Sequence, residues 1–480
     1  GNPKTDWCYN IEPDPGLNGR SIGYSRGKVL GGCSSINAMI YMRGQSVDYD
    51  YWESLGNSGW GWKDVLPIFK KSEDYQHGSD KFHGTGGELR VEERRVNWEI
   101  LDAWRNAAQE CGIPKIDEFN CGDNEGNSYF QMNQKNGVRW NATKAYLRPI
   151  KLRKNLTILS NTHVEKLKIS SLHGKHKAEG VCTKINMQTK KEFRAHKEII
   201  LSAGSVGSPQ ILQLSGVLSK ELAHRSGVKL IHDLPGVGEN LHDHLQIRSV
   251  YKVENTVTLN QKINSFFGKI MMGAEYFLYK TGPLTMPPSQ LGAFARSDSS
   301  QTTANIEWHV QPLSLDKFGD PLHKFNAITP AVCNLRPTSR GHVRIKSSNP
   351  YDYPKITLNY LSTHEDQQVA VDGLKFTRKI MNAKALKKFN PVEYLPGEKI
   401  KTYDEILHAA RDLGTTIFHP VGTCKMGQDD MAVVDEKLKV KGIENLRVID
   451  ASIMPNITSG NTNAPTIMIA EKGADMILTH

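Results

Sequence analysis

The 480-residue sequence has no uninterrupted apolar run of about 18 residues, so none of its segments is predicted to cross a membrane. Its first residues do not show a charged-then-apolar secretory leader. Its seven cysteines form no CxxC pair, which disfavours a disulfide framework or a zinc ribbon. From these absences we expect a cytoplasmic protein, with peripheral contact to a membrane left open.

Clusters of one charge sign are also missing. The net charge is +10, but the 61 Lys and Arg residues are dispersed and are not interleaved with an aromatic platform. This pattern favours a basic protein that does not bind nucleic acid. The 41 glycines and 22 prolines are typical of a loop-rich enzyme, and the length predicts two domains or one very large one.

The residue pattern after about position 155 predicts strands and then a strand followed by a helix. Residues 155–170 and 181–196 read as strands, and 199–202 as a strand followed by a small-residue turn and a helix. Ser208 is the predicted N-cap of that helix, with Pro209 in its first turn. This strand, turn and helix is typical of a nucleotide-binding α/β sheet.

In the middle of the chain, about 246–350, apolar and polar residues alternate in several segments, which predicts a mostly antiparallel sheet. A long helix is predicted around 364–389, capped by Thr363 with Asp366 or by Ser362 with Glu365. An apolar helix is predicted over 464–478.

The stretch "HPVGTCKMG" raises a question of metal chemistry, because His419, Cys424 and Met426 could all bind a soft metal. No nearby carboxylate or second histidine completes a shell, so we expect no metal site. His242 and His244 in "NLHDHL" are interpreted as structural. In "RGKVLGGCSSINAMIYMRG" (26–44), Gly27, Gly31 and Gly32 allow a ligand close to the backbone, ahead of a predicted helix start.

Three stretches together resemble the glucose–methanol–choline (GMC) family of flavin oxidoreductases: "GKVLGGCSSINAMIYMRG", "GSVGSPQILQLSG", and "HPVGTCKMG" followed by "VIDASIMPNITSGNTNAPTIMIAEKGADMI". The central region looks most like bacterial alcohol and choline dehydrogenase-like members. The resemblance implies an α/β fold, with an FAD-binding Rossmann-like domain built from discontinuous segments and a substrate domain with a mostly antiparallel sheet and helices. We expect the FAD-binding domain in 1–45, 145–247 and 405–480, and the substrate-binding domain with lid segments in 46–144 and 248–404.

The resemblance also implies the cofactor contacts. FAD would lie against Gly31, Gly32, Cys33, Ser34, Asn37, Val164, Ala203, Gly204, Asp450, Ala451, Asn463 and Pro465. The helix starting near Pro465 would stabilise negative charge on the reduced flavin. Ile36 stands where some members carry the histidine that attaches FAD covalently, so we expect non-covalent FAD.

By the same resemblance His419 is the catalytic base, and Asn461 orients the alcohol oxygen without acting as a base. Gln290 replaces a glutamate of choline-specific members, which favours a neutral primary alcohol as substrate. Electrons would pass to a quinone or similar acceptor. Alternatives are choline dehydrogenase, a lyase of the same fold, and a truncated non-catalytic binding or scaffold protein.

One family feature is missing from the sequence. The family opens with a strand, a GxGxxG turn and a helix, and none of these is present here. Because the sequence begins at Gly1, we expect it to be an internal piece of a longer protein. Whether these residues alone hold FAD is left open, as is the oligomeric state.

Overall fold

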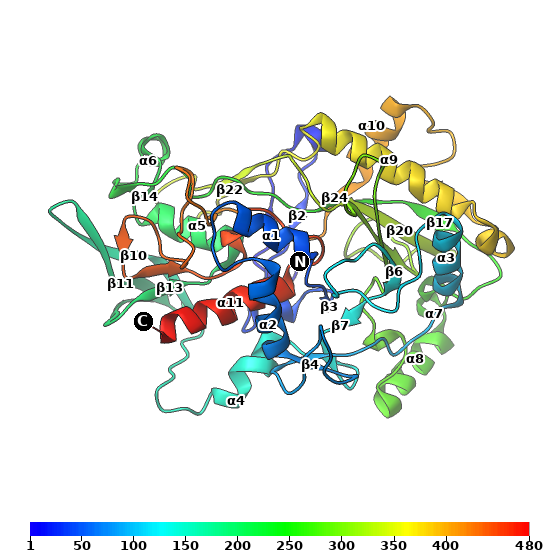
Figure 1. Cartoon of the computed structure of the whole chain (residues 1–480), viewed down its shortest axis with the longest axis horizontal. Coiled ribbons are helices and arrows are strands. Elements are labelled where there is room, and N and C mark those ends of the chain that lie inside the picture. The colour runs from blue at the N-terminus through cyan, green and yellow to red at the C-terminus, as the bar shows by residue number, and fades with distance from the viewer. Residues whose placement is uncertain (480) are drawn as a thin grey trace.

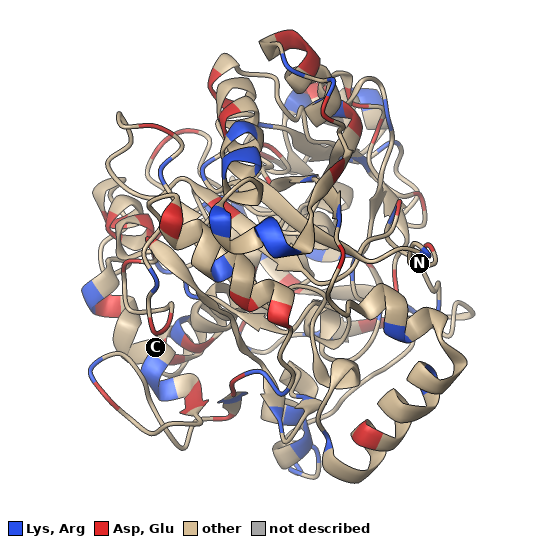
Figure 2. Ribbon diagram, turned by 90° about the vertical axis from the view of Figure 1, so that its right-hand side faces the viewer, with Lys and Arg blue, Asp and Glu red and all other residues tan. Residues whose placement is uncertain are grey.

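The computed structural model describes residues 1–479, and two hydrophobic cores organise the chain. Figure 1 shows the larger sheet on the right with α9 above it, and the β10–β13 region with α11 on the left. Figure 2 shows Lys and Arg interspersed with Asp and Glu along the ribbon.

The larger core lies on one face of an eight-stranded antiparallel sheet. The strand order is β23-β17-β20-β19-β18-β6, and β16 joins β20 to β24. The strands are β6 (Gly126–Tyr129), β16 (Leu245–Arg248), β17 (Val250–Lys252), β18 (Leu291–Ala295), β19 (Ile306–Gln311), β20 (Ala327–Asn334), β23 (Val392–Leu395) and β24 (Gly414–Thr416). The antiparallel sheet predicted for the middle of the chain is thus confirmed.

The two faces of this sheet differ sharply. Leu245, Ile247 and Trp308 point to the apolar face, which is covered by α3 (Glu99–Glu110), α9 (His364–Met381) and α10 (Tyr403–Leu413). Trp308 Nε1 donates to Thr377 Oγ1 of α9 at 2.8 Å. Side chains alternate along a strand, so the neighbours of these residues form a buried polar face on the other side. That polar face includes Gln246, Arg248, Glu307, His309 and Gln311.

The second core joins parallel strands to helices. β13 (Ile199–Leu201) pairs in parallel with β26 (Leu446–Val448), and α5 (Gly204–Leu214) follows β13. An antiparallel meander lies beside them, made of β10 (Thr162–Leu172), β11 (Lys175–Ile185) and β12 (Thr189–Arg194). α1 (Ser46–Ser54), α2 (Trp62–Ser72) and α11 (Asn463–Leu478) complete this core.

The other elements are short connections, with one longer exposed helix. The helices are α4 (Arg148–Ile150), α6 (Lys220–Ser226), α7 (Leu259–Asn264) and α8 (Phe266–Tyr279). The strands are β1 (Tyr9–Asn10), β2 (Gly23–Tyr24), β3 (Ile40–Tyr41), β4 (Glu73–Tyr75), β5 (Leu89–Val91), β7 (Gln131–Met132), β8 (Gln134–Lys135), β9 (Val138–Arg139), β14 (Val217–Leu218), β15 (His232–Asp233), β21 (His342–Arg344), β22 (Lys355–Thr357) and β25 (Ile443–Glu444). The 3₁₀-helical turns are η1 (Pro15–Leu17), η2 (Gly32–Ser35), η4 (Pro283–Thr285), η5 (Lys384–Phe389) and η6 (Ala451–Ile453), and η3 (Thr143–Leu147) is a π-helical turn.

The structure corrects four local predictions. The predicted strand over 155–170 begins only at Thr162. The long helix starts as predicted, with the Thr363 hydroxyl accepting from the Asp366 N–H, but it ends at Met381 and is followed by η5. α5 begins at Gly204, so Ser208 is not its N-cap. The glycine loop itself forms η2, and the apolar segment from Ile36 forms only the two-residue β3 instead of a helix.

The cores also cross the expected domain boundaries. Tyr9, Leu17 and Tyr24 pack in the core of the large sheet, although 1–45 is assigned to the FAD-binding domain. Trp52 and Phe69 of α1 and α2 pack in the second core, although 46–144 is assigned to the substrate domain. The domain division stays a prediction, because both segments contribute residues to both cores: Tyr41 packs in the second core, and Trp104 and Tyr129 pack in the core of the large sheet.

Among residues 1–479, no helix has both the length and the apolarity needed to cross a bilayer.

Candidate active site

His419 lies just after β24 and is held there by a buried carboxylate. Phe418 adopts a left-handed backbone conformation (φ +66°), which turns the chain sharply before His419. Asp243 Oδ1 accepts the backbone N–H of His419 at 2.7 Å and that of His244 at 2.9 Å. Asp243 Oδ2 accepts the hydroxyl of Tyr360 at 2.6 Å and that of Thr416. Asp243 therefore fixes the backbone of both histidines at once.

The ring of His419 is the middle member of a hydrogen-bonded chain. Its Nδ1 lies 3.1 Å from His244 Nδ1, and its Nε2 lies 3.1 Å from Asn461 Nδ2. His244 Nε2 lies 3.0 Å from the carbonyl of Leu335. Sequence reasoning treated His244 as a structural residue, and the structure places it in direct contact with His419.

These hydrogen bonds determine which ring nitrogen of each histidine carries the proton. A carbonyl can only accept, so His244 Nε2 carries a proton and its Nδ1 has the lone pair. His419 Nδ1–H must then donate to His244, which leaves a lone pair on His419 Nε2. The Asn461 amide N–H donates to that lone pair. His419 is therefore a neutral imidazole that presents its basic nitrogen toward Asn461.

Burial favours the same protonation state. Desolvation holds the pKa of His419 well below its ordinary value, and the nearby Arg26 guanidinium acts in the same direction. Burial likewise lowers the pKa of His244. A neutral imidazole at ordinary pH can take a proton from a substrate.

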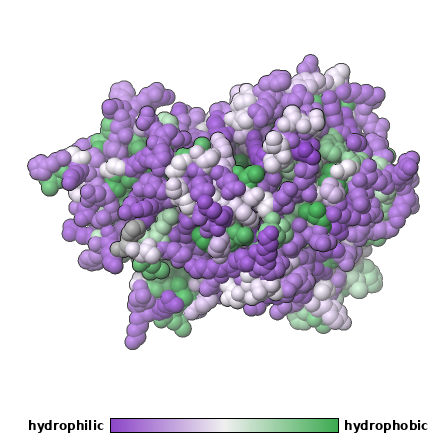
Figure 3. Space-filling model, in the orientation of Figure 1, coloured by the Kyte–Doolittle hydropathy of each residue, from purple (hydrophilic) through white to green (hydrophobic). Residues whose placement is uncertain are grey.

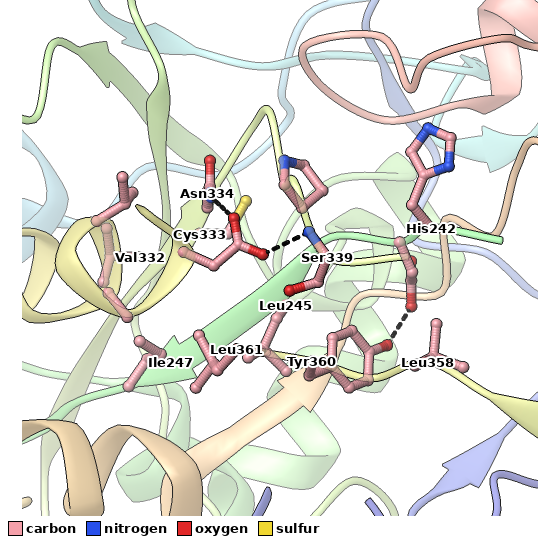
Figure 4. A pocket seen from close by; sticks show the side chains of 15 residues that line it. His242, Leu245, Ile247, Val332, Cys333, Asn334, Ser339, Leu358, Tyr360 and Leu361 are labelled. Atoms are coloured by element: carbon pink, nitrogen blue, oxygen red, sulfur yellow. Dashed lines mark hydrogen bonds between the residues drawn. The ribbon is translucent and has the colours of Figure 1, made fainter. Parts of the chain in front are cut away.

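The hollow drawn in Figure 4 lies behind this arrangement and is not a substrate cavity. It holds about 30 Å³, enough for a water molecule or two, and is lined by Leu245, Ile247 and Tyr360 on the apolar side of the sheet. The Tyr360 hydroxyl points across it to the Asp243 carboxylate. The pocket thus belongs to the support of the two histidines.

The polar face of the large sheet carries several buried atoms that lack a protein partner. Gln290, just before β18, is 1% exposed, and neither atom of its amide has a hydrogen-bond partner among residues 1–479. Arg248 donates to Gln311 Oε1 at 3.2 Å, but its Nη1 has no partner in the same range. Burial lowers the pKa of Arg248 to about 10. Buried polar groups normally find partners, so this face is suited to a bound ligand.

Glu307 and His309 stand on the same face. Glu307 Oε1 lies 2.9 Å from His309 Nε2, an ion-pair distance. Neither carboxylate oxygen of Glu307 has a hydrogen-bond partner in the described chain. His419 follows β24, which pairs with β16 of the same sheet.

The glycine loop at 31–37 has two positions in the left-handed backbone region that favours glycine. Gly31 and Gly32 both have positive φ angles, and a Cβ on Gly31 would come within 2.5 Å of Ser35 Oγ. Ser34 Oγ donates to the Gly31 carbonyl at 2.6 Å and accepts the Ala142 N–H at 3.0 Å. Cys33 lies near no second cysteine and accepts the Gly27 N–H at 3.4 Å.

Two cations beside this loop were missed by sequence reasoning. Arg139 donates to Asn37 Oδ1 at 2.8 Å and to the Ser34 carbonyl at 3.2 Å. Lys144 donates to the Arg139 carbonyl at 2.6 Å. Burial lowers the pKa of both, and neither forms an ion pair with an acid in the described chain. The stretch "GVRWNATK", which carries two basic residues five positions apart, is the signal that could have found them.

Hydrogen bonds to Asp450 connect the turn between β13 and α5 to the segment after β26. Asp450 Oδ2 accepts the Gly204 N–H at 2.9 Å and the Ser208 hydroxyl at 2.6 Å. Its Oδ1 accepts both the N–H and the hydroxyl of Ser452, the residue after Ala451. Each carboxylate oxygen of Asp450 thus accepts two hydrogen bonds from the protein. Ala203 and Ser202 are exposed, and a Cβ on Gly204 would meet open space.

The remaining predicted cofactor residues lie at two places. Val164 lies in β10, which packs against α5. Asn463 and Pro465 begin α11, whose N-cap Thr462 makes no side-chain cap, and Asn463 Nδ2 donates to Asn133 Oδ1 at 3.2 Å. Asn461 precedes this helix by two residues, so Asn461 and His419 lie beside the positive end of α11.

Groups that resemble metal ligands are otherwise engaged. Cys424 and Met426 pack in the second hydrophobic core. His83, Glu118 and Cys121 converge elsewhere, but His83 Nδ1 lies 3.1 Å from Glu73 and its Nε2 3.0 Å from Glu118. Burial opposes the charge of His83, yet hydrogen bonds to Cys121 and these carboxylates raise its pKa to about 11. A protonated imidazole has no lone pair for a metal.

Comparison with known proteins decides the family. Family models described as GMC oxidoreductase match residues 14–246 and 337–470. The chain belongs to the GMC oxidoreductase family. It is 39% identical to the alcohol dehydrogenase (acceptor) of Pseudomonas putida over 478 residues, which are 99% of this chain and 86% of that protein. It is 38% identical to the oxygen-dependent choline dehydrogenase of Brucella ovis, over 98% of this chain and 85% of that protein.

Solved structures agree with this assignment. Pyridoxine 4-oxidase from Mesorbium loti superposes with a TM-score of 0.88 at 30% identity, covering 99% of this chain and 89% of that one. Formate oxidase from Aspergillus oryzae, a protein whose FAD modification has been studied, gives 0.91 at 26% identity, over 100% and 89%. This GMC oxidoreductase is therefore an FAD-dependent oxidoreductase that acts on CH–OH donors, and the predicted fold class is confirmed.

Proposed function

We propose that this GMC oxidoreductase oxidises a neutral primary alcohol to the aldehyde, with His419 as the base. The observation that carries the proposal is the neutral His419 imidazole, whose Nε2 lone pair faces the Asn461 amide at the start of α11. An alcohol releases hydride readily only as its hydroxyl proton is removed. A base at this position would accept that proton.

The residues present fit FAD. The open space at Gly204, the positive-φ glycines at 31 and 32, and the unpaired cations Arg139 and Lys144 suit a ligand with phosphate groups. Asn463 and Pro465 at the N-terminus of α11 would hold the pyrimidine end of the flavin. When bound, FAD accepts the hydride from the alcohol carbon. Ile36 offers no side chain for covalent attachment, which supports non-covalent binding.

His419 and its partners manage the hydroxyl proton. The alcohol hydroxyl takes the place of the Asn461 N–H at His419 Nε2, and Nε2 then accepts the hydroxyl proton. The Asn461 amide donates to the substrate oxygen and orients it. The Nδ1–H of His419 stays hydrogen-bonded to His244 Nδ1, and this bond stabilises the imidazolium that forms. Asp243, bonded to both backbones, is a positioning residue.

The buried polar face of the large sheet, which we take as the substrate wall, bears on the choice of substrate. Gln290 is uncharged, and the buried guanidinium of Arg248 has no acidic partner among residues 1–479. A fixed positive charge on this wall disfavours a quaternary ammonium substrate. The Pseudomonas relative is named an alcohol dehydrogenase (acceptor), and for this protein a quinone or similar molecule is our proposal for the electron acceptor.

One observation favours choline dehydrogenase as a second candidate. The buried Glu307 carboxylate has no hydrogen-bond partner in the described chain and could pair with an ammonium group. Its 2.9 Å approach to His309 already offers a partner for its charge, so we rank this candidate second.

The test uses the FAD-loaded protein and follows anaerobic bleaching of the flavin. We expect primary aliphatic or aromatic alcohols to reduce the flavin faster than choline does. His419→Ala should lower the reduction rate by about 10²–10⁴-fold, the usual contribution of a general base, with FAD still bound. His408→Ala, on the exposed surface of α10, is the matched control. Near-normal reduction by His419→Ala, or clear preference for choline, contradicts the proposal.

A further inference from the structure

Helix α8 exposes its apolar face, whereas a helix on a protein surface normally buries that face against the core. Its most exposed apolar side chains are Phe266 (78%), Phe267 (76%), Met271 (63%), Phe277 (78%) and Leu278 (65%). With 3.6 residues per turn, these side chains and Ile270 fall in one sector of about 140°. Met272, on the other side of the helix, is the buried residue. The apolar stripe therefore points away from the protein.

The size of this stripe marks an interaction site. Three phenylalanines, each about three-quarters exposed, present on the order of 400 Å² of apolar surface before their aliphatic neighbours are counted. A contiguous patch of this size on a soluble surface is usually functional. Figure 1 places α8 at the lower right edge of the molecule, and Figure 3 shows hydrophobic residues at that edge.

The charges around α8 indicate what the stripe meets. The outward sector holds no acidic residue, because Glu275 is turned toward the Thr281 hydroxyl, 3.3 Å away. Lys262 and Lys280 lie at the two ends of the segment, and the exposed Lys269 lies on the flank of the helix, about 60° outside the sector. The Lys280 ammonium stands 4.4 Å from the centre of the Tyr276 ring. Aromatic and aliphatic side chains flanked by lysines suit the boundary of a bilayer that carries anionic lipid.

We propose that α8 is the site at which this protein docks on the surface of an anionic lipid bilayer. The 14-residue helix lies in the plane of the interface, with its phenylalanines inserted among the acyl chains and its lysines at the phosphates. A second copy of the chain is the competing occupant, and the convex shape of a single projecting helix is less suited to it than to lipid.

Docking would also place the substrate wall close to the membrane. The chain leaves α8, passes η4 with Leu284 exposed, and reaches Gln290 five residues after Thr285. This consequence rests on the proposed function: an apolar alcohol and a quinone could both enter from the lipid. The docking itself does not rest on it.

The experiment is flotation of the FAD-loaded full chain with vesicles of phosphatidylcholine, with and without phosphatidylglycerol. We expect binding to the anionic vesicles and at least about tenfold weaker partition for Phe267→Ser with Phe277→Ser. Lys269→Glu with Lys280→Glu should lose the preference for anionic lipid. Leu172→Ser with Met187→Ser, exposed apolar positions on the distant β10–β12 meander, is the matched control. Reduction of the flavin by a water-soluble alcohol should be unchanged in every variant.

Three results would overturn the proposal. The first is absence of wild-type flotation with either vesicle. The second is flotation that the phenylalanine double variant leaves unchanged. The third is a wild-type dimer in solution that this variant converts to a monomer without any effect of lipid, which would assign the stripe to a second copy. Loss of alcohol oxidation with flotation intact would instead count against the proposed function alone.

Discussion

The contact between His244 and His419 leads to a quantitative prediction. Replacing His244 by Leu keeps an apolar side chain of similar size but removes the acceptor for His419 Nδ1–H. A buried donor left without a partner costs about 1–3 kcal/mol. The ring can avoid this cost by moving its proton to Nε2, where it would donate to the amide oxygen of Asn461, whose buried Oδ1 has no partner in the described chain. Nε2 would then no longer be a base.

We therefore expect His244→Leu to slow flavin reduction by about 5- to 150-fold, which is 1–3 kcal/mol expressed as a rate. The assay is anaerobic stopped-flow reduction of the FAD-loaded protein at saturating alcohol, with flavin absorbance measured first to show that FAD is retained. His244→Gln is the matched variant, because its carbonyl can accept from His419 while its amide donates to Leu335. It should stay within a few-fold of wild type.

Two outcomes would refute this reasoning. If His244→Leu reduces the flavin as fast as wild type, the tautomer of His419 does not depend on His244. If the Gln and Leu variants are slowed equally, loss of packing and not loss of the acceptor explains the effect.

Other predictions follow from the buried charges. Burial lowers the pKa of His242, His244 and His419, so below about pH 6.5 the unfolded chain binds protons that the native one does not. Stability to urea should then fall by up to about 1.4 kcal/mol per pH unit for each histidine as the pH drops, and a shallower fall in His242→Gln would support this cause. His83, with its pKa raised to about 11, contributes stability that is present below pH 6.5 and lost as the pH rises toward 11. His83→Leu should cost about 3–5 kcal/mol by urea unfolding, and a loss under about 1 kcal/mol would contradict a buried ion network. Gln290→Glu should raise kcat/KM for choline by about tenfold relative to a neutral alcohol, and an unchanged ratio would remove Gln290 from the substrate wall.

Much of the fold could be predicted because the signals are local. The apolar strand before Ala203 and Gly204, the Thr363 cap and the apolar helix over 464–478 all depend on neighbours in sequence. Ser208 was misassigned for the opposite reason: its hydroxyl bonds to Asp450, 242 residues away, and Gly204 with φ +78° can begin the helix earlier.

The candidate site divides in the same way. His419 and Asn461 carry a family motif that a sequence can show, and the structure brings them within 3.1 Å. The role of His244 depends on a contact across 175 residues, and the unpaired state of Arg248 depends on which side chains fail to reach it. Neither has a local signal, so neither could be predicted from sequence.

The central claim is that a neutral His419 accepts the hydroxyl proton, and the most direct test is the pH dependence of flavin reduction. The imidazole is held neutral by a pKa well below its ordinary value of 6.5. The limiting rate constant of anaerobic reduction should therefore be level from about pH 6.5 upward and fall only in acid, and His419→Gln should lose both the rate and this profile. A rate that instead declines as the pH rises from about 5.5 to about 7.5 would show that the protonated imidazole is the active form and would contradict the account.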